Sequence, residues 1–499
     1  MALRSTQGRW LMLVTVLGSG MAFLDGTIIN VALPTIGRDF HASTSSLQWI
    51  LSGYLLTLAS LILLGGSLGD RFGRRRVFVL GAGVFSSASL LCALAPSAPS
   101  LIAARLVQGV GGALLTPGSL AMIEANVRRQ DRARVIGAWS GMTGVATALG
   151  PLLGGYLIGA VSWRAAFLIN VPLGAIVVLA AREVGESRDT QAHERLDVRG
   201  VALAALALAG TTYALIDGPN VGATIASIAP GAVGVVALAA FLLAERRSPT
   251  PMLPLEIFSP QFSAANLITF VVYTALGGVF FLLVAFLQIS MGYSPVGAGA
   301  ASLPVTVLML CLSAASGSLA QRIGPRIPLT LGSLMIAAGM LLMTRIDPGD
   351  SYPQSVLPAV VVFGLGLTLV VSPVTATVLA AASERHSGIA SGVNNAVARV
   401  ASLLAVAVLP LLAGLGGHRF YVPTAMTHGF HVAMLVCACI AAAGAVLAYL
   451  TINDDVLAAA DDSGEDTLTS ATAFSCAVTG PPAGLQASAR DMSAAGAPR

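Results

Sequence analysis

Long apolar runs alternate with short polar breaks along almost the whole chain of 499 residues. Crossing about 30 Å of hydrocarbon takes about 20 helical residues at about 1.5 Å each, and runs of that length recur throughout the chain. The chain is therefore predicted to be an all-α membrane protein with fourteen transmembrane helices. These lie at about 10–33, 46–69, 77–95, 101–123, 134–158, 164–182, 198–217, 224–244, 263–289, 297–320, 327–345, 355–381, 388–415 and 430–451.

The basic residues, all of them arginines, fall mainly in the short connections between these runs. Short cytoplasmic loops are enriched in basic residues. With a cytoplasmic N-terminus, four of the 27 basic residues (Arg38, Arg164, Arg345 and Arg419) lie outside, two lie within spans, two lie in the C-terminal tail, and the other nineteen lie in cytoplasmic segments. This excess predicts that both termini lie in the cytoplasm. The membrane that we expect is the inner membrane of a bacterial cell. The arginine excess also supports the count, because one missed span would invert every later connection.

Composition narrows the class of protein further. Only 10% of residues are charged and the mean hydropathy is +0.83, whereas a soluble domain carries about a quarter charged residues. The net charge of +4 resides in loop arginines, so nucleic acid is not an expected partner. We find no nucleotide-binding motif, no metal-type spacing of Cys or His and no catalytic cluster, so no ATP, cofactor, metal or enzymatic activity is expected.

An internal repeat divides the predicted spans. The segment GSLGDRFGRRRV at 66–77 is echoed by GSLAQRIGPRIP at 317–328, and Ser140-Gly141 is matched by Ser391-Gly392 at the same offset of 251 positions. Two matches at one offset indicate a duplicated half. The predicted organisation is a cytoplasmic N-terminus (1–9), a six-helix bundle (10–182), a loop with two inserted helices (183–250), a second six-helix bundle (251–451) and a disordered cytoplasmic tail (452–499).

Two charged residues within predicted spans are candidates for chemistry. An ionisable group inside a membrane is costly unless it is paired or wetted. At about 1.5 Å per residue, Asp25 and Arg105 lie roughly 13 and 8 Å below the outer surface, a difference that an arginine side chain can bridge. Asp25 is therefore either a carboxylate that gains and loses a proton as water reaches it, or half of a permanent ion pair between helices.

Two glycine-containing segments carry further signals. In the loop that joins the second and third spans, glycines permit close helix approach and a tight turn, and the acid can pair with an arginine or cap a helix; these residues are Gly66, Gly69, Asp70, Arg71, Gly73 and Arg74. In the fifth span, small residues around a proline allow close packing and a bend, or form an ordinary packing notch; these residues are Gly150, Pro151, Gly154 and Gly155. The second half has Ala401-Ser402 at the corresponding place, so this feature is one-sided.

Together these motifs resemble those of the major facilitator superfamily, in its branch of fourteen-span drug:proton antiporters. The segments that carry the resemblance are 66–76, Leu24 to Pro34, Arg105 to Ala113, Gly150 to Gly155 and Trp163 to Pro172. The resemblance implies two six-helix bundles that rock about a central cavity and export antibiotics or other drugs, driven by the proton gradient. It implies that Asp25 and Arg105 couple the protons, that 66–76 is a conformational motif, and that the Gly150 run is a bend typical of antiporters.

Alternatives remain for both the role and the cavity. Uptake of a metabolite such as an amino acid is the other transport role, while a membrane enzyme, a channel or a structural protein fits the motifs less well. Candidate cavity residues are Asn30, Gln108 and Arg399. Arg399 would contact an anionic substrate group, pair with Asp25 across the cavity, or extend to the interface. Because few acids lie in the spans, we expect a neutral, weakly basic or monocationic amphiphile as substrate, carried by a monomer.

Overall fold

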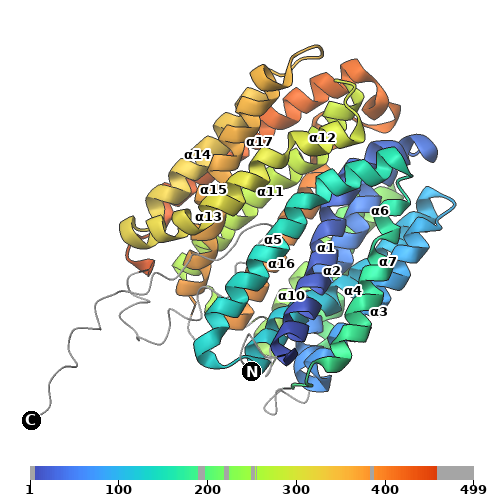
Figure 1. Cartoon of the computed structure of the whole chain (residues 1–499). Coiled ribbons are helices and arrows are strands. Elements are labelled where there is room, and N and C mark those ends of the chain that lie inside the picture. Colours follow the sequence, from blue (N-terminus) through green and yellow to red (C-terminus); the bar gives the residue numbers. More distant parts are fainter. Residues whose placement is uncertain are drawn as a thin grey trace, which may run out of the picture.

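The computed structural model describes residues 6–188, 197–218, 224–248, 253, 255–382 and 387–457. Most of the predicted tail, from residue 458 onward, and the first five residues lie outside this part of the chain. Within the described ranges there is no strand, and fourteen helices are long and apolar enough to cross a membrane. The predicted number of spans is therefore confirmed. Figure 1 shows them as a bundle of roughly parallel helices.

The helices follow the predicted runs with extensions at many ends. The first half comprises α1 (Thr6–Asp39), α2 (Thr44–Phe72), α3 (Arg74–Ala93), α4 (Ala98–Asn126), α5 (Arg129–Ala160), α6 (Ala165–Leu168), α7 (Asn170–Ala180) and the turn η1 (Ala181–Glu183). The inserted helices are α8 (Val198–Ile216) and α10 (Ile225–Arg247). The second half comprises the turn η2 (Leu255–Ile257), α11 (Pro260–Ile289), α12 (Pro295–Ala301), α13 (Leu303–Ile323), α14 (Arg326–Met343), η3 (Tyr352–Val356), α15 (Leu357–Ala380), α16 (Ser387–Leu412), η5 (Gly417–Tyr421) and α17 (Pro423–Thr451).

Two spans are interrupted near a proline, and the last span begins earlier than predicted. Pro172 and Pro304 each lack the N–H that would bond to the carbonyl four residues earlier, and the sixth and tenth spans are interrupted just before them, between α6 and α7 and between α12 and α13. The last span begins at Pro423 and not at 430, so the sequence prediction placed its start too late. Within its added first turns, the Thr427 hydroxyl donates to the carbonyl oxygen of Pro423 over 2.9 Å.

The inserted helices lie beside the place where the two halves meet. Helices α8 and α10 pack on each other, and α8 also packs against α2 of the first half and α16 of the second. The indole N–H of Trp49 in α2 donates to a carboxylate oxygen of Asp217, at the end of α8, over 2.7 Å. The inserted pair is thus attached to α2 and adjoins both halves.

The two halves are joined most closely at one end of the molecule. We call the end where α1 begins the terminal end, and the opposite end the far end (Figure 1). At the far end the packed apolar core is continuous between the halves, whereas the terminal part of the first half has a core of its own. Hydrogen bonds also cross between the halves there: Thr44 to Leu415 and Gly417, Gln48 to Val406 and Ala407, Gln288 to Val31, and Tyr421 to Ala42. The far end is closed.

Candidate functional site

Asp25 and Arg105 meet inside the first half. Asp25 lies in α1 and Arg105 in α4, and their side chains are 2% and 0% exposed. The guanidinium nitrogen Nη1 is 2.5 Å from carboxylate oxygen Oδ2. Nε of Arg105 donates to the carbonyl oxygen of Ile50 over 3.1 Å, and the Tyr54 ring lies 4.5 Å from the guanidinium carbon. The sequence prediction that one arginine side chain would bridge the two depths agrees with this geometry.

Neutral polar side chains complete the surroundings of the Asp25 carboxylate. Gln108 donates to Oδ1 over 2.8 Å and accepts from Arg105 Nη1 over 2.7 Å. Asn170 donates to the same Oδ1 over 3.3 Å, and both amides also donate to the Ser89 hydroxyl. Gln108 was a candidate cavity residue, but the structure places it behind Arg105, because it lies one helical turn further along α4 on the face that points into the bundle.

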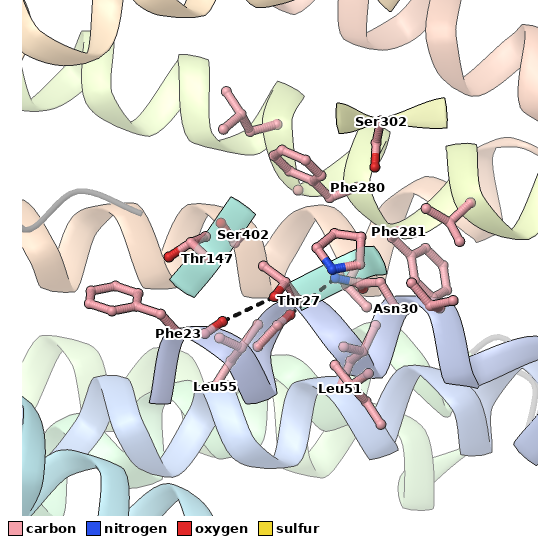
Figure 2. A pocket seen from close by; sticks show the side chains of 18 of the residues that line it. Phe23, Thr27, Asn30, Leu51, Leu55, Thr147, Phe280, Phe281, Ser302 and Ser402 are labelled. Carbon is pink, nitrogen blue, oxygen red and sulfur yellow. Dashed lines mark hydrogen bonds between the residues drawn. The ribbon is translucent and has the colours of Figure 1, made fainter. Parts of the chain in front are cut away.

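A cavity lies between the halves, next to this ion pair. Figure 2 shows Thr27, Asn30 and Leu51 of the first half across from Phe280 and Phe281 of the second. About 140 Å³ is open to water-sized molecules, enough for several waters. Helices α1, α2, α4 and α5 line it from one side, and α11, α13 and α16 from the other. The wall includes two of the three predicted cavity residues, Asn30 and Arg399, but not Asp25.

Arg105 separates Asp25 from the cavity. Arg105 borders the cavity without exposing its side chain, because Tyr54 covers the guanidinium. Asp25 does not line the cavity, and Gln108 and Asn170 donate to its carboxylate. The suggested pairing of Arg399 with Asp25 is not found, since the partner of Asp25 is Arg105. Arg399 stands in the opposite half, on α16, as a second cation of the wall.

The glycines of α5 contact two different helices. Gly150 and Gly154 face α1, where a Cβ at Gly154 would come within 2.9 Å of Ile28 and one at Gly150 would clash with Thr27. Gly155 faces α12 of the second half, and a Cβ there would lie 2.6 Å from the carbonyl oxygen of Pro295. In return, Gly299 of α12 seats against the backbone of Pro151. Helix α5 continues through Pro151, and the contacts of Gly155 and Pro151 with α12 form a close-packed seam between the halves.

The 66–76 segment is largely helical, which corrects its predicted place in a loop. Helix α2 continues to Phe72 and α3 begins at Arg74, so Gly73 alone, with φ of 111°, makes the turn. Asp70 Oδ1 lies 2.8 Å from both Nε and Nη2 of Arg74, so of the two roles that the sequence left open for this acid, the structure has the pairing with an arginine. Gly69 faces the start of α3, where an added Cβ would lie 3.8 Å from the Cα of Arg74, an ordinary contact distance, and the carbonyl of Gly69 accepts the N–H of Gly73 over 3.0 Å.

An acid that the motif analysis missed fixes this turn. Glu186, just after the sixth span, accepts the backbone N–H of Arg75 over 3.0 Å, and its carboxylate lies 3.6 Å from Arg75 Nε. The second half repeats the arrangement: Arg326, 251 positions after Arg75, donates its backbone N–H to Asp454 over 3.2 Å. Asp454 likewise follows the last span of its half. The start of the third span in each half is therefore capped by an acid from beyond the sixth.

Comparisons with known proteins agree with this architecture. The model of the Major Facilitator Superfamily matches residues 15–406. This chain belongs to the major facilitator superfamily. It is 37% identical over 404 residues to the methylenomycin A resistance protein of Streptomyces coelicolor, covering 79% of this chain and 84% of that protein. It is 34% identical to the puromycin resistance protein pur8 of Streptomyces alboniger, covering 93% and 95%. A crystal structure of the peptide transporter POT with sulfate has a TM-score of 0.66 at 16% identity, covering 94% and 98%.

Within this member of the superfamily, the residues that sequence reasoning missed are partners of the motif residues. Ser89 and Asn170 contact the Asp25 group, while Glu186 and Asp454 hold the two turns. Asn170 lay inside the quoted segment from Trp163 to Pro172, which offered a signal for it. The others are common polar residues at positions that only the folded arrangement connects to the site.

Proposed function

We propose that this chain is a proton-coupled antiporter that exports small organic drugs or antibiotics from the bacterial cytoplasm by alternating access. A single observation carries the proposal: a cavity lies between two halves that are closed together at the far end, beside the buried Asp25–Arg105 pair. Relatives named for resistance to methylenomycin A and puromycin support export as the direction of transport. The peptide transporter, at 16% identity, supports the fold alone.

Arginines orient the molecule in the proposed mechanism. Arg74, Arg75 and Arg76 lie at the terminal-end turn between α2 and α3, and Arg322 and Arg326 lie at the equivalent turn of the second half. Because cytoplasmic loops collect basic residues, we assign the terminal end to the cytoplasm. The closed far end then faces outward, and the described conformation is one from which a substrate in the cavity does not reach the outside.

Helix α1 links the proton site to the closure of the far end. Asp25 binds Arg105, while Val31, six residues further along α1, accepts a hydrogen bond from Gln288 of the second half over 3.0 Å. Protonation of Asp25 removes the charge that holds Arg105, so the contacts of α1 with α4 change. Since α1 also packs on Gly150 and Gly154 of α5, such a change reaches the seam between the halves. Proton and substrate then compete through the conformation they each favour.

The export proposal is tested in a drug-sensitive bacterial host and in everted vesicles made from it. Expression is expected to raise the inhibitory concentration of puromycin or of another compound in an antibiotic and dye panel. Vesicle uptake of the exported compound should need an acidic interior and stop when a protonophore collapses the gradient. Asp25→Asn should abolish this dependence, whereas Asp347→Asn, an exposed acid between spans, should not. Uptake that persists without a gradient refutes antiport, and the absence of any exported compound refutes export.

The remaining parts of the proposal concern assembly and energy source. We propose that a monomer carries out transport, with the proton gradient as the only driving force and without ATP, metal or cofactor. Light scattering of the purified protein tests the first point. Transport by the purified protein in proteoliposomes that contain no nucleotide tests the second, and a requirement for added ATP or metal refutes it.

A further inference from the structure

Two hydrogen-bond donors on residues of the cavity wall have no acceptor within the described part of the chain. They are Nε of Arg399 and the hydroxyl of Tyr273. The side chain of Tyr273 is 1% exposed. A buried donor without an acceptor costs free energy, so a molecule in the cavity that brings acceptor atoms to these two groups would be stabilised there.

The charged residues of the cavity wall also favour an occupant that supplies hydrogen-bond acceptors. No Asp or Glu stands among the described residues that line the cavity. The charge of Arg105 is balanced by Asp25, but Arg399 lies in the opposite half and has no ion pair with a described carboxylate. The wall thus carries a positive charge without a fixed counter-charge. The rest of it includes the aromatic rings of Phe23, Phe280 and Phe281 (Figure 2).

From this arrangement we infer that the cavity binds organic anions: amphiphilic, ring-containing molecules with a carboxylate, sulfonate or acidic hydroxyl group. The acidic group lies at Arg399 and accepts from Tyr273, and the ring system packs against Phe280 and Phe281. An anion supplies the acceptors that the free donors lack and the charge that Arg399 lacks. This inference rests on the proposed transport function. It replaces the neutral or cationic amphiphile that the sequence led us to expect.

In this arrangement the anion and the proton have separate sites. Asp25 does not line the cavity, whereas Arg399 and Tyr273 do.

Two dyes with the same ring system and opposite charge test the inference. Fluorescein is an anion at neutral pH and rhodamine 123 is a cation, and both are built on a xanthene ring bearing a phenyl group. Uptake of each is measured in everted vesicles with an acidic interior, for the wild-type chain, Arg399→Gln and Arg399→Lys. Arg345→Gln, at an exposed arginine between spans, is the matched control.

We expect the wild type to have the higher kcat/KM for fluorescein. Arg399→Gln should lower that value about tenfold to a hundredfold, mainly through KM, as expected for loss of a charged hydrogen bond. Arg399→Lys should retain most of it, and rhodamine 123 uptake should change less than about twofold in both variants.

Other outcomes overturn the inference in distinguishable ways. Uptake of rhodamine 123 in preference to fluorescein refutes anion binding and leaves export intact. An equal loss for both dyes in Arg399→Gln shows a structural role for this arginine and also refutes the inference. If the wild type moves neither dye, both the inference and the export proposal fail for amphiphiles of this size.

Discussion

Replacing Asp25 by Asn should destabilise the fold because it leaves Arg105 as a buried cation without its counter-charge. The pair is 2% and 0% exposed, so solvent does not screen it. Breaking a buried ion pair by removing one partner costs about 3–5 kcal/mol. The guanidinium keeps the carbonyl of Ile50, the amide of Gln108 and the ring of Tyr54, so we expect the lower end, about 3 kcal/mol.

A double-mutant cycle separates the pair from other effects of the substitution. In Asp25→Asn with Arg105→Gln, neither charge remains, so the loss should be smaller than the sum of the two single losses by about 2 kcal/mol. The measurement is equilibrium unfolding in mixed micelles of mild and denaturing detergent. Asp39→Asn is the control, because its pair with Arg164 at 3.1 Å is 46% and 39% exposed and should contribute less than about 1 kcal/mol.

The reasoning would be refuted by two results. The first is a stability of Asp25→Asn within about 0.5 kcal/mol of the wild type, which would mean that Arg105 finds a substitute for the lost charge. The second is strict additivity in the double variant, which would mean that the two side chains do not stabilise each other. Either result would also remove the basis for assigning proton coupling to this pair.

Three further predictions follow from the contacts between and within the halves. Gly155→Leu should separate α5 from α12 and lower transport at least tenfold, with spin-label distances across the far end shifting toward the open state. Glu186→Ala removes the cap on the N–H of Arg75 and should cost about 1 kcal/mol in the same unfolding measurement. Burial raises the pKa of Tyr421 to about 12. Its contribution to stability should thus be complete below pH about 10 and be lost as the pH rises toward 12, a decline that is absent in Tyr421→Phe.

Each of these predictions has a result that contradicts it. Normal turnover of Gly155→Leu would show that the seam is not required for cycling, with Gly83→Leu, which has open space around it, as the control. An unchanged stability of Glu186→Ala would mean that water caps α3 equally well. If Tyr421→Phe declines in alkali as steeply as the wild type, other groups account for that decline.

The fold was predictable from sequence because lipid imposes a simple rule on every span. Length and hydropathy were sufficient to count the helices, but the sixth and tenth spans, predicted as continuous, are each interrupted in the structure. The pair of Asp25 and Arg105 could also be predicted, since a charge inside a membrane needs a partner of opposite charge and few charged residues lie within the predicted spans.

The site residues that the sequence did not predict are brought to the site only by the folded arrangement of the chain. Ser89 is a neutral residue of a kind found in many spans, so nothing in the chain marks it as part of the Asp25 site. Asn170 lay in the quoted segment from Trp163 to Pro172, but only the structure shows that it donates to Asp25. Glu186 and Asp454 play equivalent roles, but they are not separated by the 251 positions that relate Arg75 to Arg326, so a search for repeats passes over them. Gly155 was recognised as small, yet only the structure shows that it faces the other half.

The reciprocal contact of Gly155 and Gly299 means that the seam between the halves can separate without breaking a hydrogen bond or an ion pair. Each glycine rests against a backbone carbonyl of the opposing helix, so the surfaces touch through dispersion forces spread over many atoms. Such contacts have no preferred partner and no charge to neutralise, and they re-form wherever the surfaces meet. The stability of the seam should therefore not depend on salt concentration or pH. The directional hydrogen bonds of Thr44 and Gln48 would then determine the lifetime of the closed far end.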